Sequence, residues 1–165
     1  EKFVPKTLRS LMRGEPAEVH ARRVPHGEPW DVAMDNLAGD RWVVGSRMYL
    51  HARNLADAVL FLINRGEPHA YGDVGVDRPD RWNIVGEREV NNLEMVGMIA
   101  AYAGKTPLTR FVDYHSSRPG HDLRYALDGT KLAKAGWVPP VPLDESLKQT
   151  IDWTLNHPRW SRLMQ

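Results

Sequence analysis

Four segments of the chain carry apolar residues at the spacing of three and four positions that is typical of an amphipathic helix. They predict helices at residues 3–13, 54–65, 91–103 and 143–156. Glycine or proline, which commonly ends a helix, follows each segment, at Gly14, Gly66, Gly104 and Pro158. At the start of the second segment, we expect Asn54 to cap the helix with its side chain.

Short runs of β-branched and aromatic residues lie between these helices and predict strands. Their sequences are AEVHA, RWVVGSRMYLH, RWNIV and LTRFVDY. Residues 21–41 contain two prolines and two glycines, so we expect a hairpin or an excursion outside the core. Near the C-terminal end, Asp128 is placed to cap a short helix in DGTKLAKAG. The pattern as a whole predicts an α/β fold, a small domain of mixed helices and short strands.

Composition narrows the class of protein. The chain has 165 residues, of which 42% are hydrophobic, and this is enough for one domain with its own core. A net charge of +1, from 22 basic and 21 acidic residues, argues against a general binder of nucleic acid or of membrane surfaces. The longest apolar run, AVLFLI at residues 58–63, is far too short to span a bilayer. The absence of cysteine fits a reducing compartment, so we expect a cytoplasmic protein.

The sequence lacks the motifs of several common enzyme classes. It contains no G-x-G-x-x-G, no P-loop, no H-E-x-x-H and no G-x-S-x-G. No tyrosine is followed four residues later by lysine, the pair that short-chain dehydrogenases use for proton transfer. The histidines show no ligand spacing, so we expect no metal site. The chain alone is therefore expected to have no catalytic residues and no turnover.

The order of the segments and one long motif nevertheless resemble a known family. The segments GSRMYLHARNLADAVLFLINRGEP and WNIVGEREVNNLEMVGMIA, followed by RPGHDLRYALDGTKLAKAGW, resemble the C-terminal half of extended short-chain dehydrogenase/reductases. Within this NAD-dependent epimerase/dehydratase family, the dTDP-glucose 4,6-dehydratases are the most similar. The resemblance covers residues 1–165 except 21–41 and 71–80, which look like insertions. It implies a substrate-binding domain without the Rossmann domain that would bind NAD and supply the tyrosine and lysine.

The same resemblance implies a binding site for a nucleoside diphosphate sugar, either a dTDP-sugar or a UDP-sugar. The implied substrate-binding residues are Lys2, Phe3, His20, Arg47, Asn92, Arg118 and His121. Arg47 and Arg118 take the positions that contact the diphosphate, where a planar guanidinium can donate two parallel hydrogen bonds. His20 replaces a tyrosine that stacks on the base.

Each of these residues also has an ordinary structural explanation. The arginines can be solvated loop residues, and His20 can be a strand residue without a ligand. Asn92 can be the N-cap of the helix that follows it. Trp82, Trp137 and Trp153 are expected in the core and not beside a cofactor.

The chain departs from the family pattern at one interdomain segment. Where the family commonly reads RDWLYVEDHA, residues 47–56 read RMYLHARNLA, so Arg53 and Asn54 replace an acidic pair. Because those acids contact the first domain in the family, we expect a changed interdomain surface. The excursion at residues 21–41 would lengthen the loop next to the base-binding position, so the nucleotide preference stays open, as does the choice between dehydratase and epimerase. We expect the parent protein to be a homodimer that binds NAD through the absent domain.

Two other hypotheses compete with this one. The first is a free-standing binding or interaction module derived from the same domain. The second is a nucleic-acid binder that uses Arg22, Arg23, Arg47, Arg53, Arg118 and Arg124, against which the net charge argues.

Overall fold

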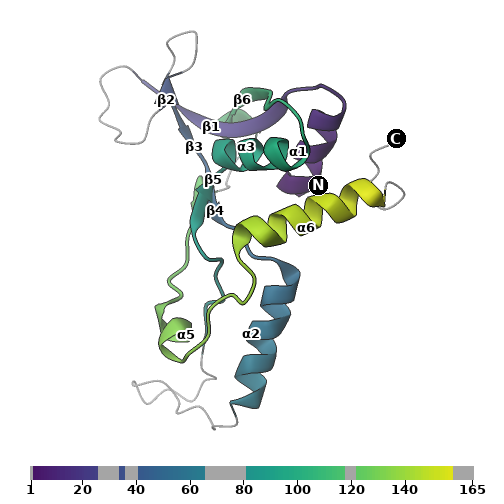
Figure 1. Ribbon diagram of the computed structural model, residues 1–165. Helices are drawn as coiled ribbons and strands as arrows, with labels where there is room; N and C mark the ends of the chain where they lie inside the picture. Colours follow the sequence, from purple (N-terminus) through teal and green to yellow (C-terminus); the bar gives the residue numbers. More distant parts are fainter. Residues whose placement is uncertain (1, 26–33, 36–40, 66–80, 118–121, 158–165) are drawn as a thin grey trace.

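The computed structural model describes residues 2–25, 34–35, 41–65, 81–117 and 122–157 (Figure 1). Its helices are α1 (Phe3–Met12), α2 (Ala52–Asn64), α3 (Asn92–Tyr102), α4 (Tyr114–Ser117), α5 (Thr130–Lys134) and α6 (Leu143–Asn156). The four long helices agree with the helical periodicity of the sequence to within two residues at each end. The short helix α5 is also confirmed. Its N-cap is Gly129 and not Asp128, but the carboxylate of Asp128 still accepts the backbone N–H of Thr130 at 2.8 Å.

Two small sheets accompany the helices. The first has the strand order β2 (Met34–Asp35), β3 (Arg41–Val44), β1 (Ala17–Val24) and β6 (Thr109–Asp113). The second has the order β5 (Glu89–Asn91), β4 (Ser46–Met48) and β7 (Arg124–Tyr125). Strand β1 is antiparallel to β3 and parallel to β6, and β4 is antiparallel to β5 and parallel to β7. The mixed helix and short-strand fold is therefore confirmed.

Strand boundaries are where the sequence prediction fails. Residues 41–51 do not form one strand, because the chain leaves the first sheet at Gly45 and enters the second. Residues 81–85 form no strand, although RWNIV has β-branched and aromatic character. The segment 21–41 is not wholly outside the core either. Strand β1 continues to Val24, which pairs with Arg41 and is buried.

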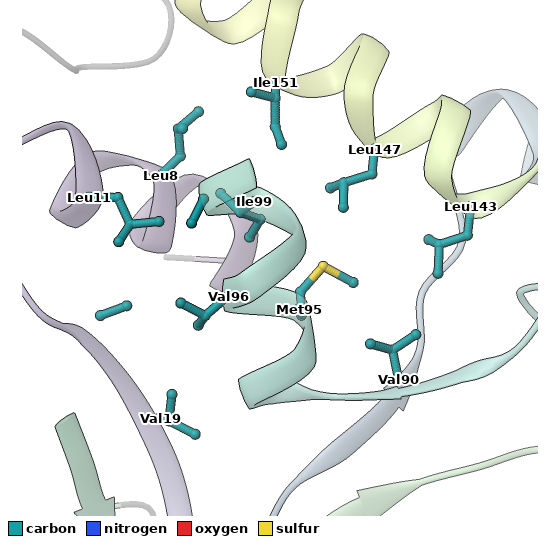
Figure 2. Packing of buried hydrophobic residues seen from close by; sticks show 12 residues of the cluster. Leu8, Leu11, Val19, Val90, Met95, Val96, Ile99, Leu143, Leu147 and Ile151 are labelled. Atoms are coloured by element: carbon teal, nitrogen blue, oxygen red, sulfur yellow. The ribbon is translucent and has the colours of Figure 1, made fainter. Parts of the chain in front are cut away.

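The larger hydrophobic core surrounds α3 (Figure 2). Helix α3 buries Met95, Val96 and Ile99 on one face and contacts α1, α6 and β1. Strand β1 points Val19 into the same core, while α6 contributes Ile151. Helix α3 is therefore apolar around much of its circumference, as a helix covered on several sides must be.

A smaller cluster joins α2, α5 and the segment between α5 and α6. Ala58, Leu132 and Trp137 form its buried centre, and Trp82 packs against it. The indole N–H of Trp137 donates to the carboxylate of Asp57 at 2.7 Å. Trp137 and Trp82 thus lie in apolar packing as expected.

The expected core position of Trp153 is wrong. Trp153 is 51% exposed and stacks on His157, with the ring centroids 4.6 Å apart. Trp153 lies on the solvent-exposed side of α6, because Leu143, Leu147 and Ile151 form the buried face of that helix.

The expected cap of α2 is also wrong. His51 is the N-cap, and its ring accepts the backbone N–H of Arg53 at 3.1 Å. Asn54 lies one turn further along and is buried, with its amide bound to both backbone groups of Val141. A buried amide needs partners for its donor and acceptor atoms, and the Val141 peptide groups supply both. Asn54 therefore connects helix α2 to the segment that precedes α6.

The packing around α3 predicts a clear difference between two isoleucines. Ile99→Ala should lower the free energy of unfolding by about 2 to 5 kcal/mol, because the side chain is fully buried and a cavity would remain. The matched control is Ile63→Ala on α2, where the side chain is 68% exposed and the change should stay within about 0.5 kcal/mol. Urea unfolding followed by circular dichroism measures both. Equal losses for the two variants would contradict this assignment of the core.

Candidate functional site

A pocket of about 720 Å³ lies where the two sheets and the first turns of α1 and α3 come together. Five of the residues implied by the family resemblance line it, namely Lys2, Phe3, His20, Arg47 and Asn92. The other two, Arg118 and His121, lie outside the described residues. Residues from four separate parts of the chain therefore meet at one cavity.

Strand geometry explains how these side chains reach the pocket. Side chains of β1 alternate, so Val19 enters the core while Glu18 and His20 lie on the opposite face and line the pocket. In the second sheet, Ser46 pairs with Asn91, which brings Arg47 of β4 close to the start of α3. The backbone N–H of Asn92 donates to the carbonyl of Gly45 at 2.8 Å and completes this junction.

Arg47 is the most firmly held cation of the pocket. Its Nη1 donates to the carbonyls of Ser46 and Leu123 at 2.6 and 2.7 Å, and its Nη2 donates to the carbonyl of Asp122 at 3.0 Å. The guanidinium also stacks over the ring of Tyr125 at 4.2 Å from the centroid. Three of its five N–H groups thus donate within the described part of the chain, and the other two have no partner there.

This geometry gives Arg47 a structural role as well. It connects β4 to the chain just ahead of β7, and these two strands pair in parallel. Arg47 is therefore not a solvated loop arginine.

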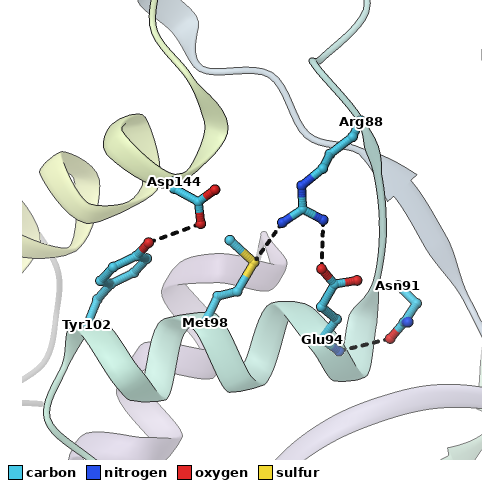
Figure 3. A network of polar contacts seen from close by, with 6 residues as sticks. All are labelled: Arg88, Asn91, Glu94, Met98, Tyr102 and Asp144. Atoms are coloured by element: carbon cyan, nitrogen blue, oxygen red, sulfur yellow. Dashed lines mark hydrogen bonds and ion pairs between the residues drawn. The ribbon is translucent and has the colours of Figure 1, made fainter.

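The two neighbouring asparagines at the start of α3 have different roles. Asn91 is the N-cap, and its side chain accepts the backbone N–H of Glu94 at 2.8 Å (Figure 3). Glu94 in turn pairs with Arg88 at 2.6 Å. Asn92 is therefore not the cap. It is buried, and its Oδ1 accepts the hydroxyl of Tyr49 at 3.0 Å.

Sequence reasoning missed an ion-pair network on the pocket wall. Glu18 accepts from Lys6 of α1 and from Arg110 of β6, each at 2.6 Å. Hydrogen bonds from Lys6 and then Arg110 hold the pKa of Glu18 at about 2. The parallel pairing of β1 with β6 places Glu18 opposite Arg110. A local sequence pattern cannot predict such a long-range contact.

The lining of the pocket favours an anionic ligand. Lys2, Lys6 and Arg47 contribute three basic side chains against the single carboxylate of Glu18. The first turn of α1 adjoins the pocket and carries no acidic residue, so the positive end of the helix dipole is not offset there.

Other kinds of site find less support among the described residues. Within those ranges, no three His, Cys, Asp or Glu side chains come together as a metal site would require. No helix in the same ranges combines the length and the apolar character of a membrane span.

Comparisons with known proteins show what the chain is similar to. No family model matches the chain. The trifunctional UDP-glucose 4,6-dehydratase/UDP-4-keto-6-deoxy-D-glucose 3,5-epimerase/UDP-4-keto-L-rhamnose-reductase of Arabidopsis thaliana is 29% identical over 97% of this chain and 19% of its own length. The dTDP-glucose 4,6-dehydratase of Escherichia coli is 30% identical over 69% of this chain and 32% of its own length. The chain is homologous to part of the nucleotide-sugar 4,6-dehydratases.

Solved structures of two related enzymes are similar to this chain in fold. The dTDP-glucose 4,6-dehydratase of Bacillus anthracis, solved with NAD, matches 99% of the chain with a TM-score of 0.68 and 20% identity. The UDP-glucuronic acid 4-epimerase of Bacillus cereus, solved with UDP-glucuronic acid and NAD, matches 94% with a TM-score of 0.64 and 13% identity. At these identities the likeness shows the fold. The chain described here spans 42% of the dehydratase and 40% of the epimerase, and it matches the C-terminal part of such enzymes.

The Glu18 network predicts a pH dependence of stability. Because folding lowers the pKa of Glu18 from 4.5 to about 2, its stabilising effect is complete above pH 4.5 and is lost as the pH falls towards 2. Glu18→Gln should therefore flatten the decline of the urea midpoint between pH 5 and 2. The control is Glu145→Gln on α6, where the carboxylate only accepts from Gln149. If the urea midpoint of Glu18→Gln declined with pH as steeply as that of the parent, the network would not stabilise the fold.

Proposed function

We propose that this chain is the nucleotide-sugar-binding domain of an NAD-dependent dehydratase or epimerase. The single observation that carries the proposal is the basic pocket, in which the five described family-matched positions converge. A nucleoside diphosphate carries negative charge on both phosphates, and three basic side chains around one cavity suit such a ligand.

Arg47 is the principal ligand-binding residue in this proposal. Its two remaining N–H groups can bind phosphate oxygens, while the carbonyls of Asp122 and Leu123 keep the guanidinium in place. Lys2 adds a further positive charge, Lys6 adds one that is paired with Glu18, and His20 provides an imidazole face for the base. In the sequence, Arg118 and His121 lie four residues and one residue before Asp122, whose carbonyl binds Arg47, and we propose them as further ligand contacts.

The reaction itself belongs to a second domain in this proposal. NAD, bound by that domain, would supply hydride transfer, and its catalytic tyrosine and lysine would move the protons. The chain described here has neither a dinucleotide-binding motif nor a tyrosine and lysine at the required spacing. Its part is to bind and orient the nucleotide sugar and to keep water from the reacting atoms.

Helix α2 offers a docking face for the NAD-binding domain. Leu55, Val59 and Ile63 follow one another at intervals of four residues, and with Leu60 they are 42% to 68% exposed. Such an apolar stripe is costly to leave in water. The chain spans 19% to 42% of the relatives compared above, so most of a relative's length is available to cover this face.

The binding role can be tested by calorimetric titration of the chain with UDP and with dTDP. Arg47→Ala should weaken binding by about tenfold or more, because a hydrogen bond to a charged group contributes about 1.5 to 3 kcal/mol. It should also lower the melting temperature, since three hydrogen bonds to carbonyls are lost. Arg47→Lys should recover only part of the affinity, because an ammonium group lacks the planar fork.

The corresponding control for Arg47 is Arg65→Ala at the end of α2, which removes a cation away from the pocket and should leave affinity unchanged. Arg118→Ala should also weaken binding. Failure of both nucleotides to bind the parent chain, or parental affinity in Arg47→Ala, would overturn the proposed function.

The docking face can be tested in a protein that joins this chain to an NAD-binding domain. Replacing Leu60 and Ile63 together by serine should lower NAD-dependent turnover strongly. The apolar stripe of α2 and the NAD-binding domain would then no longer bury each other's surfaces. Nucleotide affinity and the melting temperature of the isolated chain should change little, since both side chains are exposed there. Full turnover in the double variant would show that the NAD-binding domain does not dock on this face of α2.

A further inference from the structure

Tyr49 lies beside Asn92 at the inner wall of the pocket, and its hydroxyl is a hydrogen-bond donor. Burial raises the pKa of Tyr49 to about 12, although the charge of nearby Arg47 opposes this shift. The phenol therefore keeps its proton at any physiological pH. It can donate to the Oδ1 of Asn92 at 3.0 Å.

This hydrogen bond favours one direction of the Asn92 amide. An asparagine side chain can rotate by half a turn and exchange its oxygen and nitrogen, unless a neighbour distinguishes them. A phenol hydroxyl can donate or accept, but it donates the stronger hydrogen bond, so the amide oxygen turns to Tyr49 and the nitrogen lies on the other side, next to Gly45. A Cβ atom built on Gly45 would lie only 3.3 Å from that Nδ2 atom.

The side-chain nitrogen of Asn92 is available to donate a hydrogen bond to a ligand. Among the described residues, Nδ2 has no hydrogen-bond partner, while the side chain is buried and lines the pocket. The cap of α3 does not require Asn92, because Asn91 supplies it. A buried amide nitrogen that faces a cavity gains most from an oxygen acceptor on the molecule that fills it.

We propose that Tyr49 is a positioning residue that sets Asn92 as a hydrogen-bond donor to an oxygen of the bound nucleotide sugar. The inference rests on the function proposed above and adds a residue to it. The acceptor is a phosphate, ribose or sugar oxygen, since each of these accepts from an amide N–H. The family resemblance does not imply Tyr49, because the pattern RDWLYVEDHA has tryptophan where this chain has Tyr49.

The direct test is Tyr49→Phe, which removes one oxygen and keeps the ring. Without the hydroxyl, the Asn92 amide can turn its oxygen towards the ligand, so the affinity for UDP measured by calorimetry should fall about threefold to tenfold. Asn92→Asp should cause a larger loss, because it removes the donor and adds a negative charge near the phosphates. Asn91→Asp is the matched control. It makes the same change of charge one residue away, a carboxylate still caps the helix, and affinity should stay nearly parental.

A double-substitution cycle separates positioning from a general structural effect. If Tyr49 acts through Asn92, adding Tyr49→Phe to Asn92→Ala should cause no further loss of UDP affinity. Equal affinity of Tyr49→Phe and the parent, or additive losses in the double variant, would overturn the inference. The function proposed above would survive such a result if Arg47→Ala still weakened UDP binding. Absence of UDP binding by the parent chain would instead reject both.

Discussion

The passage of the backbone through Gly45 is the constraint on which the pocket depends. At this residue the chain leaves the first sheet and enters the second, between β3 and β4. Its carbonyl accepts the backbone N–H of Asn92, and a Cβ atom at Gly45 would approach the carbonyl oxygen of Leu123 to 2.9 Å. Three distant parts of the chain thus meet within backbone contact, and a side chain here would push them apart.

The residues on either side of this crossing take their positions from it. Arg47 reaches the carbonyls of Asp122 and Leu123 because β4 runs parallel to β7 at that point. Tyr49 reaches Asn92 because the same strand pairs with β5, which leads into α3. Arg47, Tyr49 and Asn92 are therefore positioned by one local arrangement of the backbone, and not by separate loops.

Sequence reasoning succeeded where the determining interactions are local. The long helices follow from apolar spacing, which is a local pattern whether the apolar stripe is buried, as on α6, or exposed, as on α2. The hydrogen bond from Thr130 to Asp128 at the start of α5 joins residues only two positions apart. It failed where partners lie far apart in the chain. The role of Asn54 depends on Val141, and the network of Glu18 depends on strand pairing with β6. The resemblance to the family brought Lys2, His20 and Asn92 into consideration without showing that Tyr49 would direct Asn92.

Arg47 also bears on the speed of ligand association. A free arginine side chain samples many rotamers, and a ligand that captures it must immobilise it. Here the carbonyls of three residues and the ring of Tyr125 already restrict the guanidinium before any ligand arrives. The described part of the pocket therefore holds a preformed charge. Under the proposed function, the rate of nucleotide association would depend on diffusion and electrostatic attraction more than on a search of side-chain conformations. That rate should fall as salt screens the basic lining.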